Sequence, residues 1–170
     1  MPDKFASLKP AFSKTGTITA ANASKINDGA CAFVIMSEAT AKAKGLKPLA
    51  RVVAYEDAGV APIDFGLAPA LAIQKMLKRT GISIKNIDYH EVNEAFSAVA
   101  IANTKLLDLD PSKVNVHGGA VALGHPLGMS GARIILSLMN VLKQKNGTLG
   151  MASICNGGGG ASAIIIERMN

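Results

Sequence analysis

Short apolar runs alternate with segments of helical spacing along most of this 170-residue chain, and this alternation limits the possible folds more than any other feature. Apolar runs of suitable length predict strands at residues 30–36, 49–55, 87–92, 149–155 and 161–166. Spacing and cap residues predict a short helical turn at 23–29 and helices at about 37–44, 70–80, 93–107 and 130–145. The sum is an α/β fold, a mixed sheet covered by helices that ends in an antiparallel hairpin.

The composition is that of a folded globular protein. Hydrophobic residues make up 49% of the chain and charged residues 18%, which excludes a disordered chain. The length fits one domain, with residues 1–22 irregular and residues 23–170 forming the α/β core. The net charge of 18 − 12 = +6 does not indicate nucleic-acid binding, because the lysines are scattered and aromatic residues make up only 4%.

A soluble protein is expected, with no signal peptide. The start at Met1 has no continuous apolar core, and no apolar run approaches the roughly 20 residues that cross a membrane. The two cysteines, Cys31 and Cys155, are too few for a disulfide framework, so free thiols in a reducing compartment are expected. Cys31 lies in an apolar run with no base nearby and is expected to be a small core residue.

Glycine is concentrated late in the chain, where 11 of the 17 glycines fall within residues 118–160. Because glycine lets backbone N–H groups approach a ligand closely, the functional site is expected there. A phosphate-binding loop is not indicated, since the glycines do not form GxGxxG and no Gly-Lys-Ser/Thr follows them.

Three polar side chains near these loops have both a chemical and a structural interpretation. His125 lies between a glycine and a proline, which suits a catalytic imidazole or a loop histidine hydrogen-bonded for local structure. Cys155 ends an apolar run before four glycines, so it is a poised thiolate or a small core side chain. Asn93 stands where a strand gives way to a helix, and capping alone would explain it.

Three motifs, in this order, resemble the C-terminal signatures of the thiolase family. They are Asn93-Glu94-Ala95-Phe96, Gly118-Gly119-Ala120 followed by Gly124-His125-Pro126-Leu127-Gly128, and Cys155-Asn156-Gly157-Gly158-Gly159. Matches around residues 9–12 and 19–29 extend the resemblance from about residue 8 to residue 168. Within the family, residues 62–65 and 128–130 are most similar to the mitochondrial acetoacetyl-CoA type.

The resemblance implies a thiolase C-terminal domain with the order βαβαβαββ, a mixed five-stranded sheet and helices on both faces. It also implies an acyltransferase that reversibly condenses two acetyl-CoA into acetoacetyl-CoA and CoA. Whole thiolases pair two similar halves, and the N-terminal half with the nucleophilic cysteine is absent here, since neither Cys31 nor Cys155 matches its motif. The chain alone is therefore expected to be inactive and to associate through an uncovered apolar face. The full-length protein is expected to be a homo-oligomer, a dimer or tetramer.

The resemblance assigns four catalytic residues. Cys155 is the acid and base for the α-carbon, and Gly157 N–H contributes to the oxyanion hole over the acyl-enzyme. His125 Nε2, with a water held by Asn93, forms the oxyanion hole for the thioester carbonyl, and His125 also helps to activate the nucleophilic cysteine. These roles fit the chemistry, because a carbanion beside a thioester needs a base and donors for the enolate oxygen.

Ligand contacts are implied in the same way, with no covalent cofactor. Coenzyme A is expected along the irregular first segment and the Asn93 motif, with Ser24 as the polar contact to pantetheine and the full set Phe12, Ala20, Ala23, Ser24, Ala95 and Phe96. Potassium is implied on the main-chain carbonyls of Ala20, Ala21, Ala23 and Val121. Phe65 matches an aromatic residue that helps to accept a 2-methyl branch, although Gly66 stands where that type usually has proline.

A second interpretation is a non-catalytic acyl-CoA-binding or interaction module, whose glycine loops are a ligand cradle or merely turns. A preceding half with a cysteine nucleophile in the natural gene would favour the enzyme. The resemblance implies a mitochondrial location, with the cytoplasm as the alternative.

Overall fold

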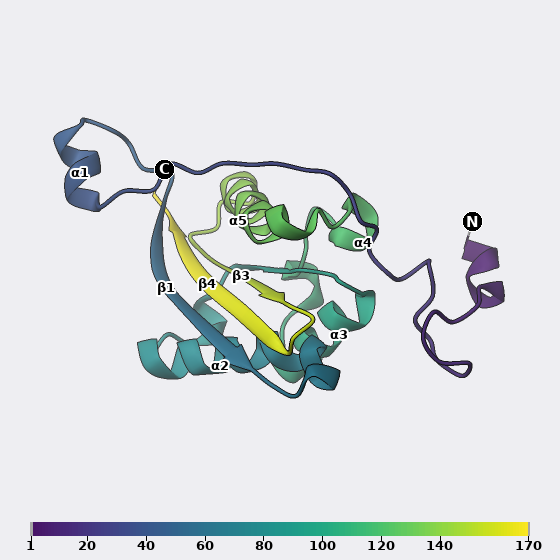
Figure 1. Cartoon of the computed structure of the whole chain (residues 1–170). Coiled ribbons are helices and arrows are strands. Elements are labelled where there is room, and N and C mark those ends of the chain that lie inside the picture. The colour runs from purple at the N-terminus through teal and green to yellow at the C-terminus, as the bar shows by residue number, and fades with distance from the viewer. Residues whose placement is uncertain (1, 170) are drawn as a thin grey trace.

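The computed structural model describes residues 2–169, and its four strands form one mixed sheet in the order β1-β4-β3-β2 (Figure 1). The strands are β1 (Ala50–Gly59), β2 (Tyr89–Val92), β3 (Leu149–Cys155) and β4 (Gly160–Arg168). β4 pairs antiparallel with both β1 and β3, whereas β2 pairs parallel with β3. The predicted hairpin is confirmed, and β4 lies inside the sheet.

Helices cover both faces of this sheet, as predicted (Figure 1). α2 (Ala68–Thr80) packs on β1 and β4, and α5 (Leu127–Gln144) packs against β2 and β3 on the opposite face. The other helices are α1 (Glu38–Ala43), α3 (Ser97–Leu106) and α4 (Ala120–Leu123), with short 3-10 turns η1 (Pro2–Ser7), η2 (Pro62–Leu67), η3 (Ile84–Asn86) and η4 (Pro111–Lys113). The α/β class is confirmed.

Two apolar layers hold the sheet between these helices. In β4, Ile165 packs in the layer with Met76 of α2, and its neighbour Ile166 packs in the layer with Leu138 of α5. All four side chains are at most 2% exposed. Burying one such side chain contributes roughly 1.5–3 kcal/mol, so the central strand is stabilised from both faces.

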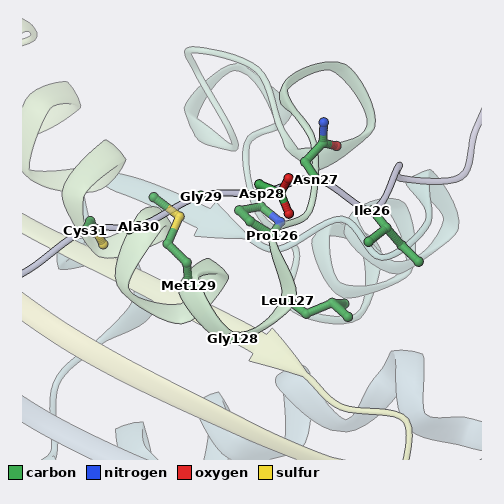
Figure 2. Close-up of a pocket in the computed structure, with 10 residues that line it drawn as sticks. All are labelled: Ile26, Asn27, Asp28, Gly29, Ala30, Cys31, Pro126, Leu127, Gly128 and Met129. Atoms are coloured by element: carbon green, nitrogen blue, oxygen red, sulfur yellow. The ribbon is translucent and has the colours of Figure 1, made fainter.

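The sheet has four strands and not five, because the predicted strand at residues 30–36 is not formed. Val34 and Ile35 are 88% and 81% exposed, and the segment pairs with no strand of the described chain. Its first residues, 29–31, line a cavity together with residues 126–129 at the start of α5 (Figure 2). An apolar run forms a strand only where another strand can pair with it.

The helical turn predicted at residues 23–29 is also wrong. Ala23 forms an isolated antiparallel bridge with Phe96, and Ile26 forms a parallel bridge with His125. The N–H of Ser24 donates to the Ala95 carbonyl at 3.0 Å. The segment therefore uses its backbone groups to bind two distant loops.

Helix boundaries shift at two positions that matter for the site. α3 begins at Ser97 and not at Asn93, because Phe96 has extended backbone angles (φ −140°, ψ 153°). α5 begins at Leu127, three residues earlier than predicted, which leaves His125 just before the helix. Within residues 2–169, no helix is long and apolar enough to cross a membrane.

Candidate active site

A cavity of about 530 Å³ lies where the end of β3 meets loops from both halves of the chain. Its lining residues are Ser24, Phe65, Ala95, Phe96, His125, Leu127, Ile154, Cys155, Asn156, Gly157 and Ser162. The structure thus brings three of the predicted catalytic residues together with three of the predicted coenzyme A contacts. The fourth catalytic residue, Asn93, lies directly behind His125.

Main-chain contacts from the N-terminal segment fix the position of the His125 loop. The N–H of His125 donates to the Lys25 carbonyl at 2.8 Å. Gly124 has a φ of 101°, and a Cβ at this position would overlap the side-chain oxygen of Asn27. Only glycine fits this close approach without strain, so the residues around Lys25 and Gly124 together aim the imidazole.

Both nitrogens of the His125 ring have a side-chain partner. Nδ1 lies 2.6 Å from Ser130 Oγ, and Nε2 lies 3.2 Å from Asn93 Nδ2. Burial, with a smaller contribution from the positive charge of Arg133, lowers the pKa of His125. His125 is therefore a neutral imidazole held in one orientation at neutral pH.

Asn93 is not a helix cap, since α3 starts four residues later. The residue is 1% exposed, and its N–H donates to the Ser153 carbonyl at 2.9 Å. Its side-chain amide contacts His125 on one side and accepts a hydrogen bond from Arg133 Nη2 at 3.2 Å on the other. The structure thus places Asn93 in a polar network with His125.

Cys155 is the last residue of β3 and is 8% exposed, although it lines the cavity. Burial raises the pKa of this thiol, so it carries its proton at neutral pH. The other cysteine, Cys31, is half-buried outside the sheet core and lines a separate cavity of about 490 Å³ (Figure 2). The expectation that Cys31 is a core residue is wrong. Both thiols are free, as predicted.

The glycine loop after Cys155 presents one unpaired N–H. Asn156 Oδ1 accepts the N–H groups of Gly158 and Gly160 at 3.1 and 3.2 Å, and the Asn156 carbonyl accepts that of Gly159 at 3.2 Å. The N–H of Gly157 has no hydrogen-bond partner in residues 2–169. This donor borders the cavity and is free to bind a negatively charged oxygen.

Three of the six predicted coenzyme A contacts, Ser24, Ala95 and Phe96, line the cavity, whereas Phe12, Ala20 and Ala23 do not. Phe96 contacts both Phe12 and Phe65 edge to face, with ring centroids 5.5 and 6.4 Å apart. Ser24 Oγ donates to the Ala95 carbonyl at 2.9 Å, which leaves its lone pairs to accept from a ligand. The Phe12 ring covers Phe96 but is itself 74% exposed.

The residues predicted to hold potassium show a partial fit. Within the described chain, the carbonyl oxygens of Ala20, Ala21 and Ala23 accept no hydrogen bond. Free carbonyls of this kind suit a hard cation that prefers oxygen. The fourth residue, Val121, lies in α4, and its N–H donates to Glu94 Oε2 at 3.1 Å. Potassium here stays a prediction, as does every contact with coenzyme A.

Sequence reasoning missed three polar residues around the site. Ser130 and Arg133 lie three residues apart in α5, a spacing that places both on one helix face, and this was the available signal. Glu91 in β2 is 1% exposed, and its Oε1 has no partner among residues 2–169. Burial raises the pKa of Glu91 to about 7, partly opposed by the charge of Arg133. No sequence pattern indicated this carboxyl.

Comparison with known families agrees with this geometry. Residues 46–168 match the family model "Thiolase, C-terminal domain", and residues 1–39 match "Thiolase, N-terminal domain". The chain belongs to the thiolase family. The unpaired run at residues 30–36 lies within the N-terminal match, and the whole four-stranded sheet lies within the C-terminal match.

Similar proteins cover nearly all of this chain. It is 59% identical to the acetyl-CoA acetyltransferase, mitochondrial, of Rattus norvegicus, over 98% of this chain and 39% of the rat protein. The crystal structure of the Bacillus anthracis acetyl-CoA acetyltransferase has a TM-score of 0.96 and 51% identity, covering 99% of this chain and 43% of that one. The Acat5 thiolase of Ascaris suum, solved in complex with coenzyme A, has a TM-score of 0.90 and 51% identity, covering 99% and 44%. The chain thus spans about two fifths of the length of the proteins it resembles.

Proposed function

We propose that this chain forms the C-terminal part of an acetyl-CoA C-acetyltransferase that reversibly condenses two acetyl-CoA into acetoacetyl-CoA and CoA. The observation that carries the proposal is the single cavity in which a buried thiol, an imidazole and an unpaired N–H meet Ser24, Ala95 and Phe96. The names of the rat and Bacillus anthracis proteins support this reaction class, and the coenzyme A complex of the Ascaris suum thiolase supports the ligand.

In the first half-reaction, acetyl-CoA acetylates the nucleophilic cysteine, whose proton goes to Nε2 of His125, and the CoA thiolate that leaves takes the proton of the Cys155 thiol. In condensation, the resulting thiolate of Cys155 takes a proton from the α-carbon of a second acetyl-CoA. His125 and a water held by Asn93 stabilise the enolate oxygen, and the carbanion attacks an acetyl group carried by a nucleophilic cysteine. The N–H of Gly157 stabilises the oxyanion formed there, and that cysteine leaves as a thiolate. In the reverse direction the Cys155 thiol returns its proton to the carbon, and the raised pKa keeps this acid protonated.

The nucleophilic cysteine is proposed to come from the part of the protein that precedes this chain in its relatives. Cys31 lines a cavity separate from that of Cys155, so the described residues place only one thiol in the site. The chain alone is therefore proposed to be inactive, and the full-length protein to be a homo-oligomer. A mitochondrial location, as the name of the rat relative indicates, is proposed, with the cytoplasm as the alternative.

The test compares the two cysteines in the full-length protein that contains this chain. Cys155→Ala should still accept an acetyl group from acetyl-CoA, seen as added mass on the intact protein, but should nearly stop formation of acetoacetyl-CoA. Cys31→Ala is the matched control and should leave both steps close to those of the parent. The reason is that proton transfer at the α-carbon belongs only to the second half-reaction.

Two results would decide against the proposal. A Cys155→Ala variant that condenses acetyl-CoA at close to the parent rate would remove Cys155 from the chemistry. A parent protein that binds coenzyme A, measured by calorimetry, but is never acetylated would favour the alternative, a non-catalytic acyl-CoA-binding module.

A further inference from the structure

Arg133 is a partly buried cation whose side chain makes its one hydrogen bond within residues 2–169 to a residue of the candidate site. Its Nη2 donates to Asn93 Oδ1 at 3.2 Å, while its Nε and Nη1 are buried without a partner among residues 2–169. Asn93 follows β2, in which Tyr89 packs towards α5, so strand alternation carries Asn93 to the same face as Arg133. The contact thus links α5 directly to the end of β2.

This contact settles which way round the Asn93 amide lies. A guanidinium has five N–H donors and no acceptor. The atom of Asn93 that faces Arg133 must therefore be the carbonyl oxygen, and the amide nitrogen must face His125. A reversed amide would place two donors against each other at 3.2 Å and leave the oxygen of a residue only 1% exposed facing the ring.

The amide orientation in turn determines the protonation of the His125 ring. Asn93 Nδ2 lies 3.2 Å from Nε2 and can only donate, so Nε2 must accept and carries no proton. The proton of the neutral ring is then on Nδ1, which donates to Ser130 Oγ at 2.6 Å. Each of these steps follows from the fact that Arg133 has no acceptor.

We propose that Arg133 is a positioning residue, which acts through the Asn93 amide to hold His125 in the tautomer with Nε2 free of a proton. This inference deepens the proposed function, on which its catalytic meaning rests. With this tautomer, His125 first accepts the proton of the nucleophilic cysteine at Nε2 and only then donates from Nε2 to a thioester oxygen. A resting ring with the proton on Nε2 could donate at once but could not act as a base.

The charges around the ring act in the same direction. Arg133 is the charged group whose field lowers the pKa of His125, in addition to burial. Glu91, on the face of β2 towards α5, has its pKa raised to about 7 and offsets the guanidinium charge only in part. The imidazolium form is therefore disfavoured in the resting site, which keeps the proton-accepting form populated.

The test reads the ring directly by ¹⁵N NMR of the histidine-labelled chain at pH 8. The three histidines are assigned with His125→Ala, and the Nε2 and Nδ1 signals of His125 report which nitrogen carries the proton. The parent should show a single pattern, with Nε2 unprotonated. Arg133→Met should shift this pattern towards a mixture of the two tautomers, whereas Arg133→Lys, which also has only donors, should preserve it. Arg51→Met, on the exposed edge strand β1, is the control for loss of an arginine.

A second variant keeps the inference testable if Arg133→Met does not fold. Asn93→Asp places an acceptor towards both Arg133 and the ring, so Nε2 should become protonated. An unchanged Nε2 signal in Asn93→Asp, or in folded Arg133→Met, would overturn the proposal. The readout needs no turnover. A full-length protein without condensation activity would therefore defeat the proposed function while leaving the tautomer result intact.

Discussion

The carboxylate of Glu94 occupies the space in which a side chain on Gly119 would lie. A Cβ at position 119 would come within 2.7 Å of Glu94 Oε1 and closer still to Oε2. Oε2 accepts the N–H of Val121 at 3.1 Å, and Oε1 accepts from Asn115 Nδ2 at 3.4 Å. Glu94 thereby fastens the Asn93 motif to the turn that leads to His125, and Gly119 makes room for it.

This packing predicts that Gly119→Ala destabilises the chain. Forcing an extra methyl group against a held carboxylate should cost about 1–3 kcal/mol of unfolding free energy, measured by urea denaturation. Gly128→Ala is the matched control, because a Cβ there meets nothing within 4 Å and alanine is favoured inside α5. Equal stability of the two variants would mean that Glu94 moves aside freely.

Glu91 predicts a pH dependence of stability. Burial raises the pKa of Glu91 in the folded chain to about 7, from an ordinary value of 4.5. Between pH 4.5 and pH 7, the folded chain therefore keeps a proton that the unfolded chain has lost. The free energy of unfolding should therefore fall as the pH rises through this window, by at most about 3 kcal/mol at 1.36 kcal/mol per pKa unit. Glu91→Gln should remove this fall, measured by urea denaturation at pH 5 and pH 8.

His90 contributes with the opposite sign and must be separated from Glu91. Burial lowers the pKa of His90 to about 4. The stability that the neutral His90 contributes to the folded chain is therefore lost as the pH falls below about 6.5. Comparing Glu91→Gln with the parent at each pH cancels the His90 contribution. Glu38→Gln, at an exposed position in α1, should change nothing. A parent-like slope in Glu91→Gln would place the titration elsewhere.

His125→Ala in the full-length protein should lower the condensation rate by about 10²–10³, the usual cost of one oxyanion-hole donor. The measurement is the rate of acetoacetyl-CoA formation at saturating acetyl-CoA. His117→Ala, at an exposed histidine, controls for loss of an imidazole. If both variants kept the parent rate, His125 would be a structural residue.

The exposed run at residues 30–36 predicts self-association of the isolated chain. The side chains of Val34 and Ile35 are 88% and 81% exposed. Replacing both with glutamate should raise the monomer fraction seen by analytical ultracentrifugation, because it adds charge to this exposed apolar surface. Ile63→Glu is the control, at an 88% exposed side chain in η2. A parent chain that stays monomeric at high concentration would contradict the prediction.

The sequence predicted the helix ends that are determined by residues near in the chain. α2 ends at Thr80, directly before Gly81, as the glycine indicated, and Ser37 caps α1 by accepting the N–H of Thr40 at 3.1 Å. The run at residues 30–36 misled because apolarity on both faces indicates burial but does not say which strand pairs with it. Period and propensity contain no information about a missing neighbour.

The candidate site was likewise predictable from the sequence only in part. The glycine clusters placed the expected site late in the chain, the resemblance grouped Cys155, His125 and Gly157 there, and all three line the cavity. The contacts that orient them were not predictable, because they join residues far apart in the chain. The bond of Arg133 to Asn93 spans 40 positions, and Asn93 and His125 lie 32 positions apart.

The interior position of β4 has a consequence for how the chain is made. β4 is the last strand in sequence, yet it separates β1 from β3, so the earlier strands have no continuous sheet until residues 160–168 have left the ribosome. After β1 is synthesised, about a hundred more residues must be added before its partner strand β4 exists. During this interval the apolar side chains of β1 depend on chaperones or on local helices for cover, and the sheet is expected to be completed only once residues 160–168 are available to pair.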